Sequence, residues 1–155
     1  MRKFLSIIAV MLLTVVSTSC LKHDLDELEV YSESDIMSVQ GVYWRWLGSD
    51  KIPGSGEQQV LQKQLNVRNS KINKEGATLD FQYQVPSNFP KDQIDQVSAS
   101  KLVVILNISP AAVIEPIEGS AVLGVPADWS KPNKYKVTAA DGSSKIWTVS
   151  VSKAQ

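Results

Sequence analysis

Hydrophobic residues form an almost unbroken run over residues 4–16, behind a basic start and ahead of the small residues 17–19. A charged start, a short apolar stretch and a small-residue cleavage site are the parts of a secretory signal peptide. The run is too short to span a bilayer comfortably, because a membrane helix needs roughly 20 apolar residues. Residues 1–19 are therefore predicted to be a signal peptide.

Beyond residue 35 the pattern changes to short stretches of β-branched and aromatic residues between turn-forming residues. Residues 78–85 alternate strictly between apolar and polar side chains, as a half-buried antiparallel strand does. Residues 36–46 are interrupted by Gly41, where a β-bulge would change the phase of the alternation. The remaining strands are expected at 60–67, 101–108 and 112–115, and in a closing hairpin of 135–139 and 147–151 around Asp141–Gly142.

Three stretches carry more specific expectations. Residues 48–56 hold Pro53 and three glycines and are expected to form a long surface loop. Residues 101–108 are apolar on both faces, which is typical of a central strand covered on both sides. Residues 112–115 lie directly before Pro116, and proline favours the edge of a sheet.

No segment shows the 3.6-residue apolar stripe of an amphipathic helix. About seven short strands with regular turn signals predict an all-β fold, an antiparallel immunoglobulin-like β-sandwich over residues 35–155. Residues 20–34, between the signal peptide and this domain, are acidic and poor in large apolar residues, and Asp35 continues their acidic character. This acidic stretch is predicted to be a solvated tether.

The only cysteine, Cys20, directly follows the small residues of the signal peptide. This arrangement resembles the lipobox of bacterial lipoproteins, in which the thiol is acylated with diacylglycerol and the chain is cut just before it. That family usually has leucine three positions before the cysteine, where this chain has Ser17. The resemblance implies that Cys20 is lipidated and anchors the protein in a membrane. The alternative is a free cysteine near an ordinary cleavage site.

Four acidic residues, Asp24, Asp26, Glu27 and Glu29, follow Cys20 closely. They resemble the surface-export signal of Bacteroidetes lipoproteins. This resemblance implies a protein of the outer membrane that is lipid-anchored and faces the cell exterior. A plain spacer is the alternative interpretation of the same residues.

Composition limits the chemistry that is available to the chain. Basic and acidic residues number 16 each, and removal of Arg2 and Lys3 with the signal peptide leaves a mildly acidic protein. That balance provides no basic face for nucleic acid, so no nucleic-acid partner is expected. The single histidine, His23, lies in the tether, which excludes a His-dependent triad or a multi-histidine metal site. No metal or other cofactor is therefore predicted.

The C-terminal stretch 124–142, GVPADWSKPNKYKVTAADG, and the strand WTVSV that begins at Trp147 form a second motif. They are similar to a domain of unknown function in lipoproteins of gut Bacteroidetes. The resemblance implies an immunoglobulin-like β-sandwich, often encoded near outer-membrane glycan-uptake systems of the starch-utilisation kind. It makes a polysaccharide or outer-membrane transport proteins the expected partners, and carries over no catalytic or binding residue. Trp147 alternates in phase with Val149 and Val151 and is expected in the core.

The run Tyr43–Trp44–Arg45–Trp46 holds the best candidates for a binding surface. Neighbours in a strand face opposite sides, so Tyr43 and Arg45 point outward if the tryptophans lie in the core. Trp44 points outward instead if a bulge shifts the phase. Exposed aromatic rings beside an arginine suit stacking on sugar rings. Trp129 is either packed in the core or a further ligand platform.

The expected domain has two suggestive carboxylate pairs, Asp128 with Asp141 and Asp92 with Asp95. Each lies in turn-like sequence, where aspartate hydrogen-bonds the backbone, so glycoside hydrolysis by two facing carboxylates is not predicted. The sequence predicts a non-catalytic cell-surface lipoprotein, a glycan-binding or accessory module of a polysaccharide-uptake system. The alternative is a structural or adhesin-type envelope protein that binds another protein through an apolar or edge-strand patch.

Overall fold

The computed structural model describes residues 30–155, of which Tyr31–Gln155 form one compact unit. The predicted signal peptide, the lipidation site Cys20 and the start of the acidic tether lie outside the described residues. Among the described residues, no helix is long and apolar enough to cross a membrane. The described part covers the whole of the expected domain, 35–155.

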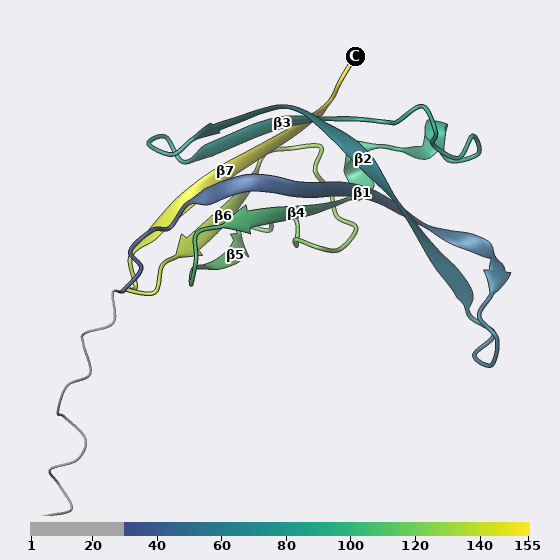
Figure 1. Ribbon diagram of the computed structural model, residues 1–155, viewed down its shortest axis with the longest axis horizontal. Helices are drawn as coiled ribbons and strands as arrows, with labels where there is room; N and C mark the ends of the chain where they lie inside the picture. Colours follow the sequence, from purple (N-terminus) through teal and green to yellow (C-terminus); the bar gives the residue numbers. More distant parts are fainter. Residues whose placement is uncertain (1–29) are drawn as a thin grey trace, which may run out of the picture. The chain divides into compact units, whose positions relative to one another are not determined.

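Seven strands and two short 3₁₀ turns make up the described part of the chain (Figure 1). The strands are β1 (Ile36–Lys51), β2 (Gln58–Asn73), β3 (Thr78–Gln84), β4 (Leu102–Ile108), β5 (Val113–Ile117), β6 (Asn133–Thr138) and β7 (Ser144–Lys153). The turns η1 (Ile94–Gln96) and η2 (Ala99–Lys101) lie between β3 and β4. The strands are hydrogen-bonded in the order β4-β1-β2-β3-β7-β6-β5. The prediction of an all-β fold is confirmed.

The strand pairs are antiparallel except for β3 and β7, which run parallel. The sheet is therefore mixed, whereas the sequence predicted antiparallel pairing. A hairpin forces its two strands to run antiparallel, but β3 and β7 are separated in the chain by β4, β5 and β6. Their relative direction results from the packing of distant segments, which alternation within a strand does not reveal.

Strand β2 belongs to two layers. Its first half pairs with β1 as far as Leu65, opposite Val42, and its second half pairs with β3 from Asn66, opposite Gln84. One layer is thus β4–β1–β2 and the other is β2–β3–β7–β6–β5. Apolar side chains from both layers enclose one core, as in a sandwich. Trp147 is fully buried in this core, as predicted.

The alternation of residues 78–85 locates β3 correctly. Leu79, Phe81 and Tyr83 are buried and alternate with more exposed polar residues. Asn73 Oδ1 accepts a 2.9 Å hydrogen bond from the Gly76 amide and so stabilises the turn between β2 and β3.

The interruption at Gly41 is a β-bulge, as predicted, because the register between β1 and β4 shifts between Val39 and Gly41. After the bulge Val42 and Trp44 are the buried residues of β1. The Tyr43 ring lies across Gly41, where a Cβ atom would meet the ring at 2.7 Å. Glycine at this position therefore lets the ring lie close to the backbone of β1.

The prediction of a long surface loop over 48–56 is wrong in its extent. Strand β1 continues to Lys51 and β2 begins at Gln58, so residues 47–60 form an extended hairpin, which we call the arm (Figure 1, lower right). A short turn closes the arm, where the Ile52 amide donates to the Glu57 carbonyl at 2.8 Å. The β1–β2 register shifts after Leu47, so the irregular residues are accommodated as a bulge within the hairpin.

Strand β4 has residues buried on both faces, as predicted, but it lies at one end of the sheet and not at its centre. The loop before β6 covers its outer edge, since Leu102 and Ala127 exchange two backbone hydrogen bonds of 3.1 and 3.0 Å. This loop occupies edge groups that another strand would otherwise pair. Strand β5, at the other end of the sheet, is the predicted edge strand.

The end of the predicted tether contacts the domain. Trp147 Nε1 donates a 2.9 Å hydrogen bond to the Ser34 carbonyl. Asp35 is buried, and its carboxylate contacts Lys145 Nζ at 2.7 Å and Lys74 Nζ at 3.3 Å. The expectation that Asp35 belongs to a solvated stretch is therefore wrong, because two lysines distant in the chain compensate the burial of its charge.

Candidate functional site

Two of the predicted ligand-binding residues lie in the core. Trp44 is 4% exposed, and its Nε1 donates to Gln93 Oε1 at 3.3 Å. Trp129 is 0% exposed, and its ring stacks on Tyr135 with centroids 6.1 Å apart and an interplanar angle of 20°. The predicted roles of Trp44 and Trp129 in ligand binding are therefore wrong, because both rings fill space between the two layers.

Tyr43 and Arg45 are partly exposed and lie on the opposite face of β1 from Trp44. Arg45 Nε and Nη2 both donate to Gln62 Oε1, at 3.0 and 2.7 Å. Gln62 is the cross-strand neighbour of Arg45, and Gln64 is that of Tyr43. The structure thus places two predicted residues beside two amide side chains that the sequence analysis did not select. The sequence pattern that could have identified Gln62 and Gln64 is the row of polar residues that alternates with the apolar residues of β2.

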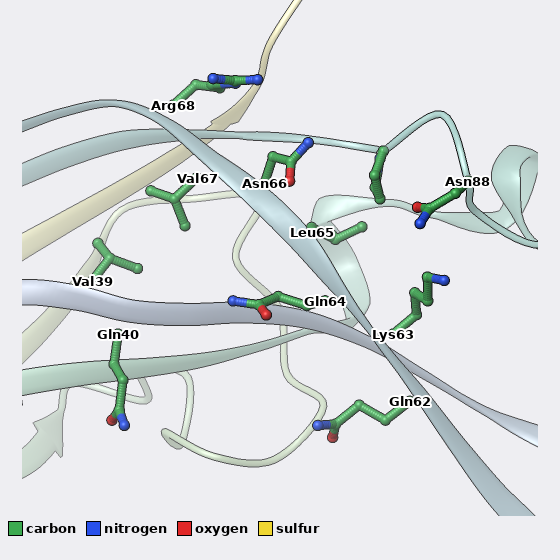
Figure 2. A pocket seen from close by; sticks show the side chains of 11 residues that line it. Val39, Gln40, Gln62, Lys63, Gln64, Leu65, Asn66, Val67, Arg68 and Asn88 are labelled. Atoms are coloured by element: carbon green, nitrogen blue, oxygen red, sulfur yellow. The ribbon is translucent and has the colours of Figure 1, made fainter.

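An open depression of about 630 Å³ lies where β1 and β2 separate (Figure 2). It forms because β2 leaves β1 after Leu65 and continues beside β3. In Figure 2 the side chains of Gln62 and Gln64 extend from β2 toward β1, while Asn88, from the loop after β3, lies at the opposite margin. We call this surface the amide depression, after its five amide side chains, Gln40, Gln62, Gln64, Asn66 and Asn88.

The charge of the amide depression differs from that of the whole chain. Its lining includes Lys63 and Arg68 but no aspartate or glutamate, whereas basic and acidic residues are equal in number, 16 each, over the sequence. Arg68 Nε donates to Gln84 Oε1 at 3.1 Å, which orients the guanidinium. Because amides offer both hydrogen-bond donors and acceptors, this surface can bind a polyhydroxylated ligand and can also accommodate negative charge.

Two of the four carboxylates singled out in the sequence, Asp128 and Asp141, stabilise turns. Hydrogen bonds from the Ser130 hydroxyl and amide, at 2.6 and 2.9 Å, lower the pKa of Asp128. Hydrogen bonds from Ser143, including one from its amide at 2.8 Å, lower the pKa of Asp141. The prediction that Asp128 bonds the turn backbone is confirmed. Within residues 30–155, no group of three or more His, Cys, Asp or Glu side chains is placed to hold a metal ion.

A second surface feature, on the arm, is apolar. Leu47 and Val60 face each other across the two strands and are 61% and 56% exposed. They line a smaller depression of about 210 Å³ together with Trp46, Pro126 and the basic residues Arg45 and Lys101. Clustered exposed apolar side chains are typical of protein–protein contacts.

The fold and these surfaces define a small all-β, sandwich-like domain with an open polar depression. The sequence profile of a family described as DUF5018-related matches residues 36–150. The chain therefore belongs to the DUF5018-related family. A comparison with curated proteins gives no match.

A solved structure of a "putative secreted protein" from Bacteroides fragilis is similar to this chain, with 38% sequence identity and a TM-score of 0.69. The match covers 80% of this chain and 98% of that one. The description of that relative as secreted agrees with the expected location outside the cytoplasm. The lipid anchor and the outer membrane stay predictions.

A solved structure of a "putative glycoside hydrolase" from Bacteroides thetaiotaomicron is 22% identical, with a TM-score of 0.46. The match covers 86% of this chain but only 28% of that one. A likeness at this level carries no argument about the function of this protein.

Proposed function

We propose that this protein is a non-catalytic glycan-binding module of the cell surface, anchored in the outer membrane by a lipid on Cys20 and serving a polysaccharide-uptake system. The observation that supports this proposal most is the amide depression beside the partly exposed Tyr43 and Arg45. Sugars present hydroxyl groups, which hydrogen-bond amides, and apolar C–H faces, which pack on aromatic rings.

Contacts within the protein hold Gln62, which lines the amide depression, and Tyr43, which lies beside it. Gln62 Oε1 accepts two hydrogen bonds from the Arg45 guanidinium, and the Tyr43 ring lies against Gly41. Ordering such side chains on binding costs conformational entropy, so a surface with fixed side chains binds more tightly. Both contacts therefore favour a binding role for this face.

The residue types in the lining favour capture over turnover. Most glycoside hydrolases use a pair of acidic side chains, one on each side of the scissile bond. The described residues that line the amide depression include no aspartate or glutamate. Its open shape suits a segment within a long polysaccharide, which can enter and leave without passing through a narrow opening. Binding without cleavage would hold a polysaccharide close to a transport system.

The proposal is tested by applying the full chain, purified in detergent, to an array of host and plant glycans. We expect binding that Gln64→Ala with Asn66→Ala weakens by about thirtyfold, because two lost hydrogen bonds of roughly 1 kcal/mol each amount to about 2 kcal/mol. Gln59→Ala is the matched control, since Gln59 is an exposed amide of the same strand outside the lining. An array on which the parent binds nothing would contradict the proposal.

The exposed apolar residues of the arm support a second candidate function, contact with another envelope protein. Leu47 and Val60 are exposed and adjacent, and exposed apolar patches favour protein partners. The test is co-purification from detergent-solubilised envelopes, with the parent chain and with Leu47→Ser combined with Val60→Ser. A protein that co-purifies with the parent but not with the variant supports this candidate, and identical recovery contradicts it.

A further inference from the structure

The amide depression does not end at Arg68. A second depression of about 530 Å³ shares Arg68, and its other lining residues are Asn69, Gln82, Gln84, Lys153, Ala154 and Gln155. Its amides are hydrogen-bonded across the strands: Asn69 Nδ2 donates to Gln82 Oε1 at 2.7 Å, and Gln84 Oε1 accepts from Arg68. The two depressions therefore adjoin at one arginine.

The charged side chains that line the two depressions are all basic. Lys63 and Arg68 line the first, Arg68 and Lys153 line the second, and no aspartate or glutamate of residues 30–155 lines either. A third depression, which adjoins the second at Asn69, includes Asp80. The stretch without carboxylate side chains thus extends along β2 from Gln62 to Asn69, roughly 20 Å at the usual rise per residue.

We propose that the two depressions form one continuous track that binds an extended acidic polysaccharide, with carboxylate or sulfate groups along its chain. This inference rests on the proposed function and names the substrate class. Arg68 lies at the junction of the two depressions. Of its three guanidinium nitrogens, only Nε is hydrogen-bonded to a described residue, Gln84. Its terminal nitrogens can therefore donate in pairs to a carboxylate or sulfate. Amides on either side supply partners for the sugar hydroxyls.

An acidic glycan explains the combination of side chains better than a neutral one. A neutral sugar needs donors and acceptors only, which amides provide alone. The described residues that line the two depressions include no aspartate or glutamate, although the chain has 16 acidic residues, and this reduces like-charge repulsion against an anionic polymer. Lys63 and Arg68 lie at separate positions of β2 and Lys153 lies on β7, so the three cations can meet charges on different sugar units.

The test compares the affinity of the full chain in detergent for polygalacturonate and for a neutral β-glucan. The track variant combines Lys63→Gln, Arg68→Gln and Lys153→Gln. The matched control combines Lys91→Gln, Lys131→Gln and Lys136→Gln, which change net charge equally at exposed positions outside the track. Thermal unfolding of both variants verifies that each is folded.

We expect the parent to prefer polygalacturonate and the track variant to bind it about tenfold or more weakly, while the control stays within about twofold. Raising the salt from about 50 mM to about 500 mM should weaken the parent's binding, because exposed charges are screened. If the parent prefers the neutral glucan, or if the track variant and the control variant lose affinity for polygalacturonate equally, the acidic-glycan track is overturned. The proposed function is not contradicted by either result. Absence of binding to polygalacturonate also overturns the track, whereas only a glycan array on which the parent binds nothing overturns the proposed function. Equal affinity for single-stranded DNA would show general anion attraction and would also overturn the track.

Discussion

The Asp35 carboxylate accepts a 2.7 Å hydrogen bond from Lys145 Nζ, although 110 residues separate the two in the chain. Lys74 contacts the other carboxylate oxygen at 3.3 Å. Asp35 directly precedes β1, and Lys145 is the second residue of β7. The point at which the chain enters the domain is thus attached to the last strand and to the turn between β2 and β3.

Asp35→Asn should lower the free energy of unfolding by about 1–2 kcal/mol, because two charge-assisted contacts are lost. Urea denaturation measures this change. Asp50→Asn is the control, since Asp50 is exposed on the arm, and we expect it to stay within about 0.5 kcal/mol of the parent. If both variants unfold at the same urea concentration, the contact does not stabilise the domain.

The same contact makes stability depend on pH. The Lys145 hydrogen bond, supported by Lys74 and opposed in part by burial, holds the pKa of Asp35 below its ordinary value. The stabilisation is therefore complete above the unfolded-state pKa of about 3.9 and is lost as the pH falls through the lower folded-state pKa. Below about pH 4, the urea midpoint of the parent should fall more steeply than that of Asp35→Asn. Parallel pH curves for the two proteins would refute this explanation.

Trp129→Ala should lower the free energy of unfolding by about 3–5 kcal/mol, because a fully buried ring is removed. Trp129→Phe should cost less. A phenyl ring keeps part of the packing on Tyr135, and the lost indole N–H has no hydrogen-bond partner among residues 30–155. Thermal and urea denaturation measure both variants. A stable Trp129→Ala protein with weakened glycan binding would instead place the ring on the surface.

Gly41→Ala should displace the Tyr43 ring, which a new methyl group would meet at 2.7 Å. We expect a loss of about 1 kcal/mol in stability, and a smaller loss when Tyr43→Ala is already present. A double-mutant cycle measured by urea denaturation reports this coupling. Additive effects of the two substitutions would show that the ring and the bulge are independent.

Sequence patterns were sufficient for elements whose partners are close in the chain. The alternation of β3 and the closing hairpin around Asp141–Gly142 could be located because each depends on neighbouring residues. Gly142 has a φ of 86°, which is the backbone conformation that favours glycine in a tight turn. The bulge at Gly41 was recognisable for a similar local reason.

Features that depend on distant segments could not be predicted in this way. The contact of Asp35 with Lys145 and the parallel pairing of β3 with β7 join parts of the chain that no local pattern relates. The amide depression exists because β2 passes from one layer to the other after Leu65, which is a property of the whole sheet. The burial of Trp44 likewise depended on the phase that β1 adopts after its bulge.

The central claim, that the amide depression binds a glycan, is tested most directly by mapping a bound sugar on the protein. The side-chain amides of glutamine and asparagine give their own signals in proton–nitrogen NMR spectra, so binding can be observed at the residues concerned. With an oligosaccharide selected from the array, we predict signal shifts at Gln62, Gln64 and Asn66. Shifts confined to the arm around Leu47 and Val60, or no shift at saturating sugar, would contradict the claim.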